Sequence, residues 1–169
     1  WVQRYAPELD QRCRPQLKVT NDSYRVDETY IKIKKQWYYL YRAVDSTGAT
    51  LDFMLSPTRD ADAAERFFRQ VLQASHTLTP RVITVDKNAA YPLAFGALQH
   101  DGTLPETCLF RHCKYLNNVV EQDHRAVKRV TRRMVGFKAF AAAQDTLIRV
   151  ELRQKKKKKQ MGVEEEAEG

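Results

Sequence analysis

The sequence predicts an α/β fold in which a mixed five-stranded sheet carries helices on its faces. Residues 24–56 contain three successive runs of aromatic and β-branched residues, joined by connections short enough for hairpins. After Pro57 the apolar spacing alternates between helical and strand-like segments. Strands followed by alternating helices and strands are typical of a sheet with helices packed against it.

The first three strands are expected to form an antiparallel meander. Their sequences are YRVDETYIKI (24–33), WYYLYRAVD (37–45) and ATLDFMLS (49–56). The connections have hairpin length and consist of Lys34-Lys35-Gln36 and Ser46-Thr47-Gly48. Four aromatic side chains in the second run could stack on nucleic-acid bases, namely Trp37, Tyr38, Tyr39 and Tyr41. An aromatic strand more often belongs to the core, and we prefer that interpretation.

The remaining elements follow in alternation. Apolar positions recur at helical spacing in DADAAERFFRQVLQAS (60–75), with Asp60 as the expected N-cap. RVITV (81–85) has the composition of a buried strand that runs into Asp86. A helix near residues 89–99, a short strand at 107–110 and a long helix from about 117 to 133 complete the pattern. The strands at 81–85 and 107–110 bring the predicted sheet to five.

The two ends differ from the body of the chain. Residues 1–20 are amphipathic at first and then interrupted by Pro7 and Pro15, so we interpret them as the end of a missing helix followed by a linker. Residues 151–169 contain the lysine run 155–159 and then four glutamates. Blocks of like charge repel, and a disordered tail is therefore expected there. The globular domain is predicted to span residues 21–150.

Charge and composition restrict the function. The 169 residues carry a net charge of +8, and residues 1–150 alone hold 23 Lys/Arg against 16 Asp/Glu. This basic body favours nucleic acid as a partner, although an ordinary solvated basic surface is the alternative. The sequence has neither an apolar run of membrane-spanning length nor a secretory signal. Three cysteines without such a signal suit a reducing cytosol.

Three acidic residues form the candidate catalytic and metal site. Asp27 lies in the first strand, Asp86 ends the fourth, and Glu121 lies on the last helix, with 34 residues between it and Asp86. Strand ends and one helix can bring such carboxylates together, and Mg²⁺ prefers oxygen ligands of this kind. Two ions held this way support in-line phosphoryl displacement. Glu28 should point to the opposite face of the sheet from Asp27, because strand side chains alternate.

The last predicted helix has a basic face around the third acidic residue. At about 100° per residue, one side of this helix presents Glu121, His124, Arg125, Lys128 and Arg132. Valines such as Val127 lie on the other side and are expected to pack on the sheet. The four basic residues are the predicted DNA contacts. A solvated helix face with an incidental glutamate is the alternative.

Several of these segments resemble the DDE-type transposases of bacterial insertion sequences, in particular insertion-sequence family six. The resemblance rests on VDETYIKI, WYYLYRAVD, VITVDKNAAYP and KYLNNVVEQDHRAVKRVTRRMVGFKAF. It implies a ribonuclease-H-like fold with helices on both sheet faces. It also implies that Asp27, Asp86 and Glu121 bind two Mg²⁺ ions, for which Mn²⁺ can substitute. Lys128 matches a basic position expected to contact DNA near the transposon end.

The resemblance further implies an activity and partners. Such enzymes hydrolyse a phosphodiester at the element's end and join the exposed 3′-hydroxyl to target DNA. They act on paired ends as homo-oligomers, in the bacterial cytoplasm near the nucleoid. Full-length relatives carry an N-terminal helix-turn-helix region, of which residues 1–20 would be the end. A catalytically inactive DNA-binding remnant and a nuclease of the same fold are the alternatives.

Overall fold

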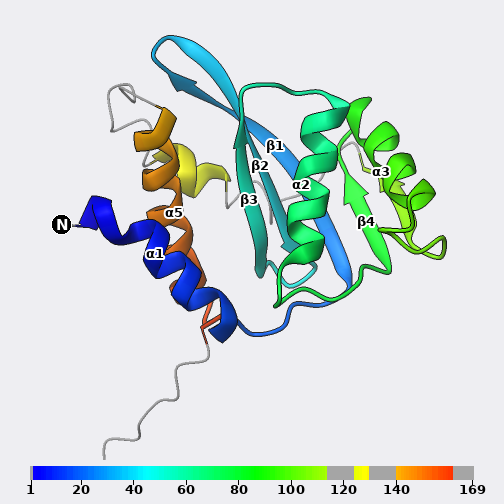
Figure 1. The fold of residues 1–169 in the computed structure, drawn as a ribbon, viewed down its shortest axis with the longest axis horizontal. Coiled ribbons are helices and arrows are strands. Elements are labelled where there is room, and N and C mark those ends of the chain that lie inside the picture. Colours follow the sequence, from blue (N-terminus) through cyan, green and yellow to red (C-terminus); the bar gives the residue numbers. More distant parts are fainter. Residues whose placement is uncertain (1, 114–123, 130–139, 162–169) are drawn as a thin grey trace, which may run out of the picture.

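The chain folds around a mixed sheet with the strand order β3-β2-β1-β4-β5, as the computed structural model in Figure 1 shows. The structure describes residues 2–113, 124–129 and 140–161. The two hairpin pairs, β1 with β2 and β2 with β3, are antiparallel, whereas β4 is parallel to both β1 and β5. The strands are β1 (Ser23–Ile33), β2 (Gln36–Asp45), β3 (Thr50–Ser56), β4 (Val82–Val85) and β5 (Leu109–His112). The predicted meander and both later strands are confirmed.

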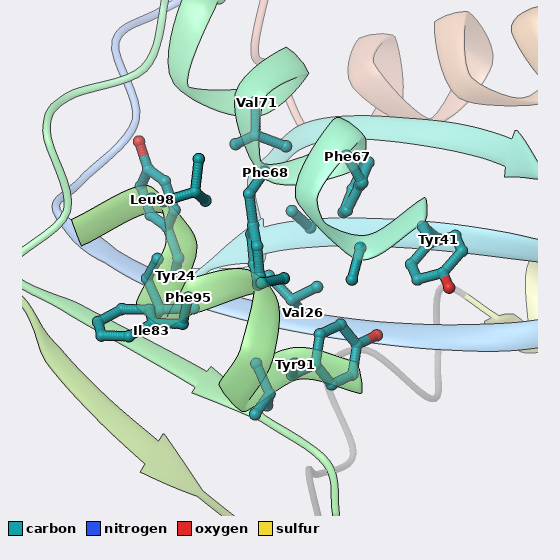
Figure 2. Close-up of a cluster of buried hydrophobic side chains, with 14 of the residues drawn as sticks. Tyr24, Val26, Tyr41, Phe67, Phe68, Val71, Ile83, Tyr91, Phe95 and Leu98 are labelled. Carbon is teal, nitrogen blue, oxygen red and sulfur yellow. The ribbon is translucent and has the colours of Figure 1, made fainter. Parts of the chain in front are cut away.

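Two helices cover one face of the sheet and enclose an aromatic core. These are α2 (Ala61–Gln73) and α3 (Ala90–His100), and Asp60 caps α2 by accepting a hydrogen bond of 2.8 Å from the Ala63 amide. Their apolar sides meet the alternate residues of β1, β2 and β4 that point to this face (Figure 2). The largest contributors are Tyr24, Tyr41, Phe67, Phe68, Ile83, Tyr91 and Leu98.

The opposite face is covered by α5 (Phe140–Lys157), on which α1 (Val2–Cys13) packs. A smaller apolar cluster joins this face to α5 and to the helical residues 124–129, with Ile31, Leu40, Val127 and Leu147 among its members. Val127 thus packs as predicted. Helices on both faces agree with the ribonuclease-H-like fold class expected from the sequence.

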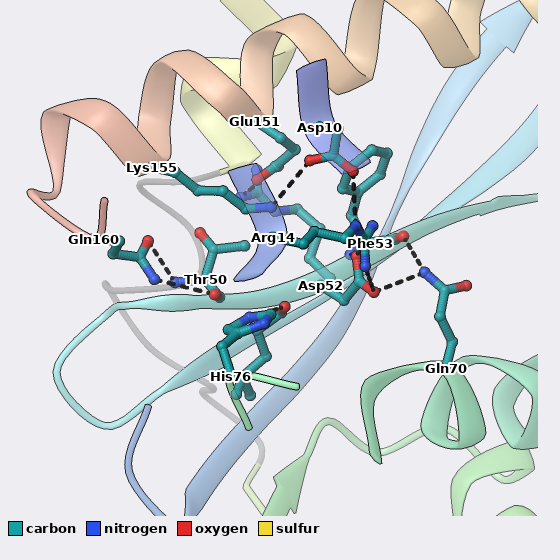
Figure 3. Close-up of polar contacts among 12 residues, drawn as sticks. Asp10, Arg14, Thr50, Asp52, Phe53, Gln70, His76, Glu151, Lys155 and Gln160 are labelled. Carbon is teal, nitrogen blue, oxygen red and sulfur yellow. Dashed lines mark hydrogen bonds and ion pairs between the residues drawn. The ribbon is translucent and has the colours of Figure 1, made fainter. Parts of the chain in front are cut away.

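Charged side chains are buried between α1, α5 and the sheet (Figure 3). Arg42 of β2 is fully buried and pairs with Glu151 of α5 at 2.7 Å, and the Lys155 ammonium lies 3.4 Å from Asp10 of α1. Arg14, in the short 3₁₀ helix η1 (Arg14–Gln16), bridges Asp10 and Asp52. The Glu151 pair therefore joins α5 to the sheet, and the Lys155 pair joins α5 to α1.

The expectation of a disordered tail from residue 151 is therefore wrong for residues 151–161. Residues 151–157 continue α5, and Gln160 is buried, with its side-chain amide bonded to the backbone of Thr50. The lysine run suggested like-charge repulsion, but Lys155 contacts a buried carboxylate, while Lys156 and Lys157 are exposed to solvent. Residues 162–169 lie outside the described part of the chain.

In the part of the chain that the structure describes, none of the helices combines the length and apolarity that crossing a membrane requires.

Candidate active site

Asp27 and Asp86 lie side by side at the edge where β4 ends. In the parallel pairing of β1 and β4, Val26 is the partner of Val85, and each aspartate is the next residue of its chain. Parallel neighbours lie about 4.8 Å apart, so the register brings the two backbones together at this point. Val26 points into the α2–α3 core, so strand alternation assigns Asp27 to the other face, whereas Asp86 is the first residue after β4.

Both carboxylates are anchored through one oxygen to the adjacent backbone. Asp27 Oδ1 accepts a hydrogen bond of 2.8 Å from the Glu28 amide, and Asp86 Oδ1 accepts one of 2.6 Å from the Lys87 amide. The Asp27 side chain is 20% exposed, so water and ligands can reach it. These short local bonds hold the carboxylates in place while keeping them at the surface.

His124 is a predicted site residue that lies against Asp27. Its Nδ1 is 3.6 Å from Asp27 Oδ2, which is longer than a good hydrogen bond. Burial, followed by the positive charges of Arg42 and Lys128, lowers the pKa of His124 to about 3. The imidazole is therefore neutral at pH 7 and packs beside the carboxylate as an uncharged group. Because His124 is buried, it is better placed to pack beside Asp27 than to contact a DNA phosphate directly.

The two other described basic residues predicted to contact DNA are on the surface. Arg125 and Lys128 are exposed, and Lys128 is close enough to influence the pKa of His124. Glu121 and Arg132 lie outside the residues that the structure describes, so the position of the third predicted carboxylate stays a prediction. Among the described residues, three or more His, Cys, Asp or Glu side chains do not gather into a metal-binding group.

Glu28 forms a buried polar centre directly behind the aspartate pair. Its carboxylate is 3% exposed and contacts Arg59 at 2.6 Å, the Asn88 side-chain amide at 2.9 Å and the Tyr91 hydroxyl. Burial and the nearby Glu28 charge raise the pKa of Tyr91, so the phenol keeps its proton and donates a hydrogen bond to Glu28. As predicted from strand alternation, Glu28 points away from Asp27.

This centre connects the two aspartates through the backbone. Glu28 follows Asp27 in β1, while Asn88 lies two residues after Asp86 in the loop that leads to α3. The Asn88–Glu28 hydrogen bond therefore fixes the Asp86 loop against the strand that carries Asp27. Sequence reasoning set Glu28 aside as a ligand and did not identify this role. Two features of the sequence could have indicated it: the alternation of side chains along β1, which turns Glu28 away from Asp27, and the presence of Asn88 two positions after Asp86.

Arg42 is a second residue that the sequence did not single out. It is the cross-strand partner of Asp27, and its side chain lies on the same face of the sheet. Glu151 and Gln154 of α5 hold its guanidinium at 2.7 and 2.9 Å. A fixed positive charge therefore lies next to Asp27 and is itself balanced by α5. An arginine in the middle of an aromatic run gave little indication of burial.

The donor set at this edge fits a hard divalent cation. The two carboxylates, one within β1 and one directly after β4, carry oxygen atoms of the kind that such a cation prefers, and both are partly exposed to solvent. The neutral His124 adds no charge that would repel a cation. The arrangement is chemically suited to Mg²⁺ or Mn²⁺.

Comparison with known proteins gives a family-level match. Residues 21–160 match the model of a family described as a DDE domain. The chain is 38% identical over 154 residues to the Staphylococcus aureus transposase for insertion sequence-like element IS431mec, with 89% of this chain and 65% of that protein covered. The S. aureus transposase for insertion sequence element IS257 in transposon Tn4003 matches to the same extent. The chain thus spans 65% of the length of these relatives.

Solved structures agree on the fold. The HTLV-2 integrase catalytic core domain in complex with magnesium superimposes with a TM-score of 0.53 at 18% identity, over 69% of this chain and 73% of that one. The catalytic core domain of BIV integrase gives 0.54 at 17% identity, over 78% and 84%. At these identities the likeness establishes a shared integrase-core architecture.

Proposed function

The chain belongs to the DDE domain family of insertion-sequence transposases, and we propose that it acts as a metal-dependent DNA strand-transfer catalyst. The observation that carries the proposal is the register of β1 and β4, which places Asp27, within β1, beside Asp86, the first residue after the end of β4. In the proposed site Glu121 is the third acidic ligand. The substrate is DNA at the ends of an insertion element, together with target DNA.

The proposed reaction has two phosphoryl-transfer steps. Water first attacks a phosphodiester at the element's end, the P–O3′ bond breaks, and a 3′-hydroxyl is released. That hydroxyl then attacks a target phosphorus, forming a new P–O bond and releasing a target 3′-hydroxyl. Two Mg²⁺ or Mn²⁺ ions between the carboxylates would neutralise the phosphate and lower the pKa of the attacking oxygen.

The residues of this chain contribute mainly position and charge. Asp27 and Asp86 would hold the ions, and the Glu28–Asn88 contact would keep the Asp86 loop in register with β1. The exposed Arg125 and Lys128 would bind phosphates flanking the reacting bond, because cations beside a site attract polyanions. His124 and Arg42 would fix the surroundings of Asp27.

The direct test is the conservative variant Asp86→Asn. Cleavage of a labelled oligonucleotide and its joining to a second duplex in Mg²⁺ or Mn²⁺ should fall by about 10⁴-fold, the scale for losing a directly acting catalytic group. Metal-free DNA binding should stay within about twofold, because the phosphate contacts are elsewhere. Mn²⁺ binding, followed by electron paramagnetic resonance, should weaken in the same variant.

Asp22→Asn serves as the matched control, since Asp22 is a half-exposed carboxylate that pairs with Arg81. It should leave both cleavage and Mn²⁺ binding unchanged. Cleavage without joining would favour the nuclease alternative. Absence of both reactions, in a protein that still binds DNA, would favour the inactive remnant. Equal loss of DNA binding and cleavage in Asp86→Asn would assign Asp86 a structural role.

A further inference from the structure

The β1–β2 hairpin carries an exposed aromatic cluster that the proposed reaction does not use. Figure 1 shows the tip of this hairpin extending beyond the neighbouring strands. Trp37 is 58% exposed and Tyr30 is 49% exposed, and with Tyr39 they line a shallow pocket of about 320 Å³. The prediction that the aromatic run is core therefore holds for Tyr41, which is fully buried, and is wrong for Trp37.

The three rings are arranged around a common centre. Tyr30 contacts Trp37 edge to face, with ring centroids 6.2 Å apart, and lies 5.4 Å from the Tyr39 ring in a tilted geometry. About half of the surface of Trp37 and Tyr30 stays in water, so these two rings gain only part of the stabilisation that full burial gives. Their mutual contacts nevertheless hold them in a fixed orientation with ring faces available for a flat ligand.

Positive charge surrounds this cluster. Lys32 lies 5.5 Å from the centroid of the Trp37 ring, and Arg59 lies 5.8 Å from that of Tyr30. Residues 29–41 contain Lys32, Lys34 and Lys35 but neither Asp nor Glu. The carboxylate that precedes this segment, Glu28, is buried and already contacts Arg59. A partner with flat rings and negative charge fits this surface.

The turn supports the same conclusion. Lys34 and Lys35 have φ values of +48° and +65°, a left-handed conformation in which hairpins prefer Asn and Gly. Two lysines therefore occupy positions where a residue other than Asn or Gly is disfavoured. The two ammonium groups extend the positive surface to the hairpin tip.

We propose that the Tyr30–Trp37–Tyr39 cluster binds unpaired bases of a DNA strand by stacking, while Lys32, Lys34 and Lys35 hold its phosphates. This inference rests on the proposed function, because a strand held at Asp27 would continue along β1. Tyr30 is three residues from Asp27, or about 10 Å at the rise of a strand, and strand alternation places it on the opposite sheet face, the one to which Glu28 points. The hairpin would thus hold a frayed or distorted stretch of DNA on the α2–α3 face, beyond the nucleotides held at Asp27.

Tryptophan fluorescence provides the test. The chain has two tryptophans, so the Trp1→Phe variant leaves Trp37 as the sole reporter. Its emission is measured during titration with a thymidine oligonucleotide and with an abasic oligonucleotide of equal length, both in EDTA. We expect quenching by the thymidine strand alone. In anisotropy measurements, Trp37→Ala should weaken thymidine-strand binding on the order of tenfold and leave abasic-strand binding unchanged.

Three further variants complete the design. The Lys34→Gln/Lys35→Gln double variant should weaken binding of both strands equally, since phosphates are common to them. Trp37→Phe should recover part of the lost affinity, which a misfolded hairpin would not do. Tyr5→Ala, a matched exposed aromatic on α1 that is 42% exposed, should bind like the wild type.

The outcomes separate this inference from the proposed function. Equal quenching by both strands, or none, would overturn base stacking even if the protein cleaves and joins DNA. Base-dependent quenching in a protein without cleavage activity would support base stacking on the aromatic cluster and contradict the proposed catalytic activity. Concentration-dependent self-association that Trp37→Ala abolishes, with unchanged DNA affinity, would instead make the hairpin a contact between two copies and overturn the inference.

Discussion

The two faces of the sheet are stabilised by different chemistry. The α2–α3 face is packed with aromatic and aliphatic side chains, including Phe67, Phe68 and Leu98. The α1–α5 face combines a smaller apolar cluster with buried ion pairs such as Arg42–Glu151 and Lys155–Asp10. Apolar packing tolerates small changes in shape, whereas a buried charge needs its partner. The candidate catalytic Asp27 lies on the charged face.

This difference has a consequence for the site. Because Arg42 is opposite Asp27 in the β1–β2 pairing, the charge balance on α5 also sets the electrostatic environment of Asp27. The apolar face reaches the site through Glu28, which contacts Tyr91 and Asn88. One face therefore contributes charge to the site, and the other contributes rigidity.

The largest effect on stability is expected from breaking the Arg42–Glu151 pair. Glu151→Ala leaves the Arg42 charge buried, and removing one partner of a buried pair costs about 3–5 kcal/mol of unfolding free energy. Urea denaturation followed by circular dichroism measures this value. The double variant Arg42→Met/Glu151→Met should be far less destabilised, because neither charge remains. If the double variant were as unstable as the single one, packing and not charge would dominate at this position.

The corresponding change on the apolar face is Leu98→Ala. Leu98 is fully buried in the α2–α3 core, and a Leu→Ala change in a core costs about 2–5 kcal/mol. Leu93→Ala on the same helix is the matched control, since Leu93 is 67% exposed and should change stability by less than about 0.5 kcal/mol. Equal effects at the two positions in urea denaturation would contradict the assigned packing of α3.

Sequence patterns predicted the apolar face much better than the charged one. Helical spacing in residues 60–75 located α2, its Asp60 cap and the buried Phe67 and Phe68, because burial of an apolar stripe repeats with the helix period. The same reasoning failed at residues 151–161. Five successive lysines carry no periodic signal, and only tertiary contact with Asp10 makes Lys155 a buried residue.

In the candidate site, too, local sequence patterns predicted some features, while others depend on tertiary contacts. The proximity of Asp27 and Asp86 was predictable because each ends or interrupts a recognisable apolar strand, and the register of β1 with β4 brings these two backbone positions together. Arg42 and Glu28 escaped notice because their roles depend on cross-strand and loop partners. A single sequence does not encode such partners as a local pattern. The places of Glu121 and Arg132 remain predictions.

A smaller loss is expected from Glu28→Gln, which tests the connection between the apolar face and the site. The amide keeps the shape and can still accept a hydrogen bond, but Arg59 loses its charged partner. Hydrogen bonds to charged groups contribute about 1.5–3 kcal/mol, and the partial exposure of Arg59 places the expected loss at the lower end.

Two readouts distinguish a positioning role for Glu28 from a purely structural one. If the Asn88 contact positions Asp86, strand transfer should fall more than stability alone explains, with kcat reduced at unchanged KM. Glu65→Gln is the matched control, because Glu65 also pairs with an arginine, Arg69, but on the exposed side of α2. If the Glu28→Gln variant is destabilised but its folded fraction is fully active, Glu28 stabilises the fold and does not position Asp86.

The smallest effect concerns His76, which links the loop after α2 to β3. His76 is buried, its Nε2 lies 2.9 Å from the Leu51 carbonyl oxygen, and burial lowers its pKa below the usual 6.5. The unfolded chain takes up a proton near pH 6.5, whereas the folded protein resists it until a lower pH. His76 therefore contributes stability above pH 6.5 that is lost as the pH falls, by at most about 1.4 kcal/mol per pH unit. Urea denaturation between pH 7.5 and 5 should show a shallower decline for His76→Gln, whose amide can still donate to Leu51, and identical slopes would contradict this assignment.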